Sequence, residues 1–422
     1  MKILFAFENT LPNTRADAEV FVTTAKYLAR LTAGSWLHIP LRNGGNRDEV
    51  GALVGMPVVR ACAPVRPAVL RHICCGLTIV FRKEFRQADL VYTRNLWVAW
   101  LTLLFGQKVA FDHYRPWPAQ IPPLQLWIYR LICNRRFLIN ICHSDYTTRK
   151  YLELGIPQDK LQCVRNGFEP QRLRARLSLE AAKLQIGVPA SKKTVVYTGR
   201  INRKKGLDLV IEAAKRLPDI QFILVGSEGD GPIERQASAV ANIRVVTWQP
   251  PEVVARYVFA ADVLLIPPSW HPLAEFGSTV LPLKLYLYMA SGRPILAGAT
   301  PDVAEVLRHG ENAFLCRPDC LDSLLAGIRR LTTDVGLASR LAARSAQDSL
   351  GFTWDARAAR IADIVASRLR APSAEHGRWD RPQSRAWMVQ SWRWLVHLVR
   401  NRYWVLPPNA TPAPAVPSPP AA

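Results

Sequence analysis

Residues 195–217 read VVYTGRINRKKGLDLVIEAAKRL, and this stretch indicates the fold of the second half of the chain. A run of β-favouring residues ends at Gly199, which is typical of a buried strand that leads into a tight turn. From Leu207 onward the apolar residues recur at helical spacing, so we expect a helix to follow. A strand, a turn and a helix in this order form one repeating unit of an α/β domain.

The same alternation continues on both sides of this stretch. Runs typical of buried strands occur at residues 2–7, 88–95, 107–114, 137–146, 222–226, 243–248, 261–268 and 294–298. Most are separated by enough chain for a helix, and this arrangement is typical of parallel sheets. We therefore predict two Rossmann-like, doubly wound α/β domains that face each other across a cleft. In such sheets ligands bind beyond the carboxyl ends of the strands.

Changes in composition divide the chain into four predicted parts. A polar stretch beside the Gly-Val-Pro sequence at 187–189 predicts a first domain over residues 1–186 and a second over residues 187–370. A Trp- and Arg-rich extension follows over residues 371–406. Residues 407–422 are so rich in Pro and Ala that we expect a disordered tail.

The charge of the chain calls for an anionic partner. The 422 residues are 49% hydrophobic and 21% charged, which indicates a folded protein, and their net charge is +22. We find no nucleic-acid-binding module, so nucleic acid is not an expected partner. Arg and Lys residues surround the apolar run at 72–81, a pattern that fits an acidic membrane surface, although a solvated basic face is an equal alternative.

The extension contains a predicted amphipathic helix over residues 386–405. Gln390, Arg393, His397 and Arg400 fall on one face, whereas Trp392, Leu395 and Val399 fall on another. Such a helix can lie in a membrane interface or fold its apolar face back onto the globule. Because no apolar run is long enough to span a bilayer, we expect a cytoplasmic protein, with peripheral attachment to the inner face of the membrane as a further expectation.

Glycines and cations gather where the second domain should bind ligands. Gly199 and Arg200 follow the strand at 195–198, and Lys204, Lys205 and Gly206 precede the helix at Leu207. A helix N-terminus with nearby Arg and Lys suits a phosphate group. A second expected anion cradle combines Gly226, after the next strand, with a loop that contains Gly277, Ser278 and Thr279.

These motifs resemble the family 4 glycosyltransferases, which have the GT-B fold. The resemblance covers most of residues 1–370. It is carried by the stretch at 195–217 and by FAADVLLIPPSW at 259–270, which is followed by PLKLYLYMASGRPIL at 282–296. Residues 144–168 resemble the family's junction between domains, and WDARAARIADIV at 354–365 resembles its closing helix.

The resemblance implies transfer of a sugar from a nucleotide diphosphate sugar to an acceptor hydroxyl, with retention at the anomeric carbon. No metal and no further cofactor are expected. Arg200 and Lys205 match the residues that bind the diphosphate, where fixed cations stabilise the charge that develops as the bond breaks. The implied donor-binding residues are Gly199, Gly226, Glu275, Gly277, Ser278, Thr279 and Lys284.

The first domain is expected to bind the acceptor, which the resemblance implies to be lipid-linked or a saccharide. Asp112 and His113 end the strand at 107–114, where the family often places a histidine near the acceptor and the transferred sugar. We predict that His113 orients a hydroxyl group or moves a proton. Arg94 and Asn95, at the end of the strand at 88–95, are expected to line the acceptor side.

The sequence departs from the family at the ribose site. Many members carry two glutamates eight positions apart, and their positions fall here on Thr279 and Leu287. Leucine has no group that accepts a hydrogen bond from the ribose hydroxyls, and Glu275 is a candidate substitute for the first glutamate. This departure keeps open a second interpretation, in which the protein is a catalytically degenerate scaffold or partner subunit.

Overall fold

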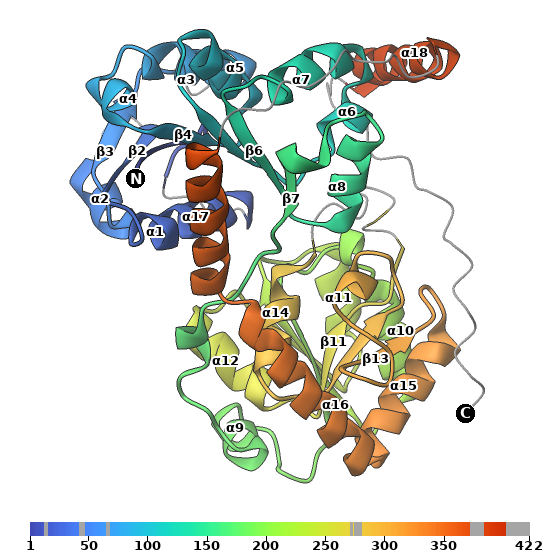
Figure 1. Ribbon diagram of the computed structural model, residues 1–422. Coiled ribbons are helices and arrows are strands. Elements are labelled where there is room, and N and C mark those ends of the chain that lie inside the picture. Colours follow the sequence, from blue (N-terminus) through green and yellow to red (C-terminus); the bar gives the residue numbers. More distant parts are fainter. Residues whose placement is uncertain are drawn as a thin grey trace. The chain divides into compact units, whose positions relative to one another are not determined.

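The computed structural model describes residues 1–11, 16–41, 47–64, 68–270, 273, 281–371 and 384–401. The chain forms two compact units (Figure 1). Of the described residues, the first unit contains those of 1–166 and 354–401, and the second contains those of 167–353. Each unit contains one sheet in which all strand pairs are parallel, and this finding confirms the predicted doubly wound domains.

The sheet of the first unit has the strand order β3-β2-β1-β4-β5-β6-β7. The strand order changes direction between β1 and β4, so a ligand crevice is expected at the carboxyl ends of these two strands. The strands are β1 (Lys2–Ala6), β2 (Gly34–Pro40), β3 (Val58–Ala61), β4 (Leu90–Thr93), β5 (Val109–Asp112), β6 (Phe137–Cys142) and β7 (Leu161–Cys163). The connecting helices are α1 (Ala16–Ala29), α2 (Arg47–Val54), α3 (Ala68–Ile79), α4 (Lys83–Gln87), α5 (Leu96–Leu104), α6 (Trp117–Gln120), α7 (Gln125–Ile132) and α8 (Asp145–Leu152).

The sheet of the second unit has the strand order β10-β9-β8-β11-β12-β13. Here the order changes direction between β8 and β11. The strands are β8 (Thr194–Thr198), β9 (Gln221–Ser227), β10 (Ile243–Thr247), β11 (Val263–Ile266), β12 (Ile295–Gly298) and β13 (Phe314–Cys316). The helices are α9 (Leu179–Gln185), α10 (Leu207–Arg216), α11 (Pro232–Ser238), α12 (Pro251–Phe259), α14 (Leu283–Ala290), α15 (Leu321–Thr333) and α16 (Val335–Asp348).

The division between the units differs from the boundary that we expected after residue 186. The second unit already begins at Gly167, because α9 packs against α12 and the buried ammonium of Lys183 lies 2.7 Å from a carboxylate oxygen of Asp262. The second unit also ends before α17 (Trp354–Arg370), which packs against α1 and β6 of the first unit. The first unit is therefore discontinuous in sequence.

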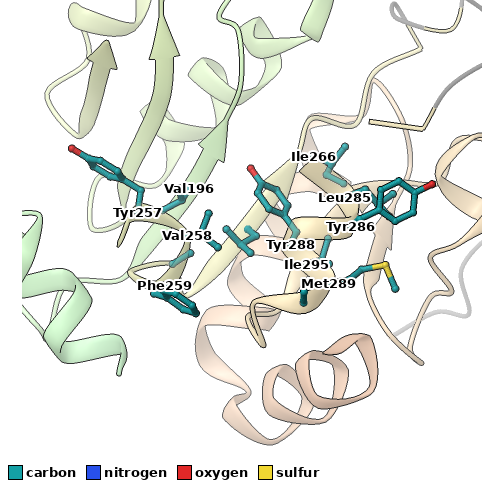
Figure 2. Packing of buried hydrophobic residues seen from close by; sticks show 14 of the residues in the cluster. Val196, Tyr257, Val258, Phe259, Ile266, Leu285, Tyr286, Tyr288, Met289 and Ile295 are labelled. Atoms are coloured by element: carbon teal, nitrogen blue, oxygen red, sulfur yellow. The ribbon is translucent and has the colours of Figure 1, made fainter. Parts of the chain in front are cut away.

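Packing in the second unit fixes the position of α14. Tyr286, Tyr288 and Met289 of this helix are fully buried in a cluster with side chains of β8, β11 and α12, as Figure 2 shows. The hydroxyl of Tyr288 accepts a hydrogen bond of 2.7 Å from the backbone N–H of Thr198, at the end of β8. Helix α14 is thereby held beside the carboxyl end of β8.

The C-terminal extension forms one helix in its described part, α18 (Ser384–Asn401), which starts and ends a few residues before the predicted range of 386–405. It packs against the short 3₁₀ helix η1 (Pro122–Leu124) of the first unit, and the indole of Trp387 donates a hydrogen bond of 3.0 Å to the carbonyl of Pro122. No helix in the described ranges has the length and apolar character needed to cross a bilayer. The predicted disordered tail at 407–422 lies outside the described residues.

Candidate functional site

Two glycines form the base of the candidate donor site in the second unit. Gly199 follows β8 with φ +127°, and Gly226 lies within β9 with φ +116°, which are backbone conformations that favour glycine. A Cβ atom on Gly226 would lie 2.6 Å from the carbonyl oxygen of Gly199. Any larger residue at position 226 would therefore separate the ends of two neighbouring strands, so these two predicted residues are brought together.

Lys284 places a cation directly above this turn. Its Nζ atom lies 3.6 Å from the centroid of the Tyr197 ring, and a Cβ atom on Gly199 would approach it to 2.9 Å. Burial lowers the pKa of Lys284 well below its ordinary value, and the positive charge of Lys205 lowers this pKa further. Within the described residues Lys284 has no carboxylate partner. Two cations whose charges repel each other in this way favour a bound anion, which would relieve the repulsion.

The loop that carries Lys205 is fixed by a close approach to the end of β11. Gly206 has φ +68°, and a Cβ atom on it would lie 2.3 Å from the Cβ atom of Ser269. This contact joins the two strands between which the sheet order changes direction. Lys205 precedes α10, whose first N–H groups have no partners within the helix, so its position suits a phosphate group.

Arg200 lies at the same edge of the sheet but on the surface. Its Nε atom lies 3.0 Å from a carboxylate oxygen of Glu228, and both side chains are more than half exposed. Exposed ion pairs of this kind contribute little stability, so the Arg200 guanidinium can leave Glu228 and pair with a ligand phosphate at little cost. Glu228 was not identified from the sequence, and its position directly after β9 is the signal that would have pointed to it.

Four of the predicted donor-binding residues, Glu275, Gly277, Ser278 and Thr279, lie outside the described residues. Leu287, at the expected ribose position, is partly buried and packs against the core of the second unit. It provides a hydrophobic contact and no hydrogen-bond acceptor.

His113 is held in one protonation state at the end of β5. Its Nδ1 atom accepts a hydrogen bond of 2.8 Å from the backbone N–H of Arg115. Burial, followed by the charges of Arg94 and Arg115, lowers the pKa of His113 well below its ordinary value. The ring is therefore neutral and carries its proton on Nε2, so it can donate a hydrogen bond to a sugar or acceptor oxygen.

Asp112 has a structural role in place of the acceptor-side role that we expected. Its carboxylate lies 2.8 and 3.0 Å from Nη2 of Arg357 on α17, and it also accepts hydrogen bonds from His143 and from Tyr92. Burial alone would raise the pKa of Asp112, but Arg357 and His143 outweigh this effect and hold the pKa well below its usual range. Its oxygens are used inside the first unit, so we withdraw Asp112 from the acceptor residues.

The predicted acceptor residues Arg94 and Asn95 are buried after β4. The Asn95 side-chain oxygen caps α5 by accepting from the N–H groups of Trp97 and Val98, whereas its Nδ2 atom has no partner among the described residues. The guanidinium of Arg94 lies 5.3 Å from the centroid of the Tyr114 ring.

Glu8 follows β1 on the other side of the point where the strand order reverses. It is 8% exposed, and its Oε2 atom also has no partner within the described residues. Buried polar groups without partners are costly, so Glu8 and Asn95 mark this edge of the first unit as a place where ligand hydroxyls would be stabilised. Sequence reasoning missed Glu8, although its position after the first strand was a usable signal.

No group of three or more His, Cys, Asp or Glu side chains suited to a metal ion occurs in the part of the chain that the structure describes.

The two doubly wound sheets, with cations and close-packed glycines at the carboxyl edge of the second, define a GT-B type protein. Residues 192–334 match the family described as glycosyl transferases group 1. This match and the shared fold support the resemblance to the family 4 glycosyltransferases that was found in the sequence.

Curated relatives agree with this assignment. The chain is 23% identical over 210 residues to an uncharacterized glycosyltransferase of Methanocaldococcus jannaschii, which covers 47% of this chain and 52% of the relative. It is 28% identical over 242 residues to the D-inositol 3-phosphate glycosyltransferase of Mycolicibacterium paratuberculosis. This alignment covers 54% of the present chain and 50% of the relative. The chain thus spans about half the length of the curated relatives it matches.

Solved structures share the fold. Anabaena Alr3699/HepE in complex with UDP and glucose matches 87% of this chain and 100% of its own, with a TM-score of 0.67 and 17% identity. A glycosyltransferase from Rickettsia africae matches 87% of this chain and 98% of its own, with a TM-score of 0.71 and 14% identity.

Proposed function

We propose that the protein is a retaining glycosyltransferase that moves a sugar, of the hexose type, from a nucleotide diphosphate sugar to an acceptor hydroxyl. The observation that carries the proposal is the position of Lys284 above Gly199, beside Lys205 and at the point where the strand order reverses. This arrangement supplies positive charge and open backbone at one place, as a diphosphate requires.

The proposed reaction needs few protein groups. The bond between the anomeric carbon and the leaving phosphate oxygen breaks, and a bond from that carbon to the acceptor oxygen forms on the same face. The acceptor's proton passes to the departing phosphate. Lys205, Lys284 and Arg200 stabilise the negative charge that develops on the diphosphate, so no metal is required. In the first unit, His113 donates its Nε2–H to a sugar or acceptor oxygen.

The comparisons suggest the substrates to test first. Anabaena Alr3699/HepE has been solved with UDP-glucose, and relatives include an amylovoran biosynthesis glycosyltransferase of Erwinia amylovora. We propose a nucleotide sugar donor, with UDP as the first candidate, and a lipid-linked or saccharide acceptor in polysaccharide or glycolipid synthesis. We place the protein in the cytoplasm. A nucleotide sugar is its co-substrate, and no further cofactor is needed.

A binding experiment tests the donor site. Titration calorimetry with UDP, GDP and ADP, each also as a sugar conjugate and without added metal, is expected to show one preferred nucleotide. Arg200→Ala and Lys205→Ala should each lower turnover by roughly 10²-fold, the usual effect of losing one preorganised charge-stabilising group. Wild-type turnover in both variants would contradict the site assignment.

Leu287 favours a second candidate function, that of a degenerate GT-B protein that acts as a scaffold or partner subunit. Its side chain packs against the core where a carboxylate would bind ribose. The variant Leu287→Glu separates the two functions. A gain in nucleotide affinity supports a divergent enzyme, whereas the absence of nucleotide binding in both forms supports the scaffold.

A further inference from the structure

Exposed apolar side chains are concentrated on the first unit. Of the eighteen exposed large hydrophobic residues in the described ranges, eleven belong to α3, α5, the residues that directly follow them, and α18. Scattered exposed apolar residues are ordinary, but a large group of them marks an interaction surface. We call this group the apolar face: Leu70, Leu77, Phe81, Trp100, Leu104, Phe105, Trp387, Met388, Val389, Trp392 and Leu395.

The helices that carry the apolar face are joined by aromatic contacts. The rings of Phe81 and Phe105 lie 6.4 Å apart between their centroids and link the ends of α3 and α5. Trp127 of α7 lies 6.4 Å from Trp100 of α5, measured in the same way. The hydrogen bond from the Trp387 indole to η1 attaches α18 to the same region. Helices α3, α5, α7 and α18 thus form a row along one side of the unit (Figure 1).

Helix α18 has apolar side chains on two sides. Trp394 packs against the core cluster of the first unit, and Trp387 bonds to η1. Met388, Trp392 and Leu395 are 55%, 67% and 44% exposed, and their spacing of four and three residues places them on one stripe of the helix. The predicted apolar residues Trp392 and Leu395 therefore do not fold back onto the globule.

The charged residues within α3, α5, α7 and α18 are all basic. None of α3, α5, α7 and α18 contains an Asp or Glu residue, although the whole chain has 33 of them. Arg130 and Arg393 are exposed on α7 and α18, and Lys83 and Arg86 are exposed on α4, which follows α3. Tryptophan beside arginine, on helices that do not cross the bilayer, is typical of proteins that lie in the headgroup region.

We propose that the apolar face binds the surface of an anionic lipid bilayer. The side chains of Met388, Trp392 and Leu395 and the Phe81–Phe105 pair insert between the headgroups. Nearby Arg and Lys side chains pair with lipid phosphates. This inference goes beyond the proposed reaction and does not depend on it. A bilayer fits better than a single protein partner, because the apolar groups extend over several helices whose charged residues are all basic.

Flotation of the full chain with lipid vesicles tests the proposal. Wild-type protein should bind phosphatidylcholine vesicles that contain phosphatidylglycerol, and bind vesicles of phosphatidylcholine alone more weakly. The triple variant Met388→Ser/Trp392→Ser/Leu395→Ser should lower the partition coefficient by at least about tenfold, since three inserted apolar side chains are lost. Arg393→Gln should lower binding to anionic vesicles by about fivefold, which corresponds to the ~1 kcal/mol typical of one basic residue.

Matched controls keep the test specific. Trp248→Ser/Leu350→Ser removes side chains that are 63% and 74% exposed on the second unit, and it should leave vesicle binding unchanged. If the triple variant melts at a lower temperature than wild type, Phe81→Ser/Phe105→Ser provides a second probe of the same face.

Three results would overturn the proposal. The first is that the wild type does not bind anionic vesicles at low salt. The second is that both apolar variants bind vesicles as strongly as the wild type does. The third is that the wild type binds no vesicles and forms a dimer that the triple variant converts to a monomer. Calorimetry with UDP on the same samples separates this proposal from the enzymatic one. Vesicle binding without nucleotide binding would contradict only the proposed reaction.

Discussion

Replacing Arg357 by alanine is expected to destabilise the first unit strongly. Arg357 is 3% exposed and Asp112 is 4% exposed, so the variant leaves a buried carboxylate without its cationic partner. Arg357 also donates hydrogen bonds to the carbonyl oxygens of Val164 and Arg165 and to the hydroxyl of Thr24. The same change therefore removes partners from two other segments of the unit.

The size of the effect follows from the burial of the pair. Removing one member of a buried ion pair costs about 3–5 kcal/mol. For a unit of this size about 1 kcal/mol lowers the melting temperature by about 2–4 °C, so the expected decrease is roughly 6–20 °C. Because the pKa of Asp112 is lowered in the folded state, its contribution is fully present above the ordinary aspartate pKa of about 3.9 and is lost as the pH falls through the lowered value. The comparison therefore belongs at neutral pH.

Differential scanning calorimetry measures this decrease, and Arg360→Ala on the exposed side of α17 is the matched control. Asp112→Asn combined with Arg357→Ala should be more stable than Arg357→Ala alone, since the uncompensated charge is then absent. A decrease no larger than that of Arg360→Ala would refute the reasoning.

Three further predictions concern the candidate site. Because burial lowers the pKa of Lys284 well below its ordinary value, its ammonium loses its proton at a lower pH than a free lysine does, so the affinity for UDP should already fall below the ordinary lysine range. Lys284→Arg should flatten this profile, and a flat wild-type profile in calorimetry would contradict the prediction. Gly226→Ala should lower the unfolding free energy of the second unit by roughly 1–3 kcal/mol in a melting assay, because the added Cβ atom would collide with Gly199. Gly351→Ala is the control and should have little effect, because a Cβ atom at that position meets nothing within 4 Å. His113→Ala should lower turnover by roughly tenfold or more and leave the nucleotide affinity unchanged. The wild-type rate should show no histidine titration between about pH 6 and 8, since this imidazole stays neutral. Equal turnover in the variant and the wild type would remove His113 from the site.

The sequence predicted most of the strands, including the edge strand β10, but it missed the interior strand β2 and the short edge strands β3, β7 and β13. The runs at 2–7 and 195–198 are almost wholly apolar because both faces of a central parallel strand are covered. By contrast, β3, β7 and β13 have only three or four residues and lie at sheet edges, where the apolar pattern is too short to recognise.

The candidate site was only partly predictable for a related reason. Gly199 and Lys205 were predicted because they occur at a recognisable turn, and Lys284 was predicted from the family resemblance; the structure places Lys284 beside Gly199. The pairing of Arg357 with Asp112 joins residues 245 positions apart, and no local pattern encodes such a distance. One signal was present, since Arg357 occupies the same side of α17 as the buried residues Ala358, Ile361 and Val365. A cation on the apolar side of a helix requires a buried partner.

The discontinuity of the first unit has a consequence for biosynthesis. All seven strands of its sheet are translated before the second unit, but the helix that supplies Arg357 is translated only after it. Until then Asp112 lacks its guanidinium partner in the nascent chain. The second unit is instead one continuous segment whose two ends are tied together, because Phe168 donates a backbone hydrogen bond of 2.9 Å to Phe352 and pairs with Thr353. Translation order thus lets the later segment mature first, and the earlier one acquires its final stability only when the last helices emerge.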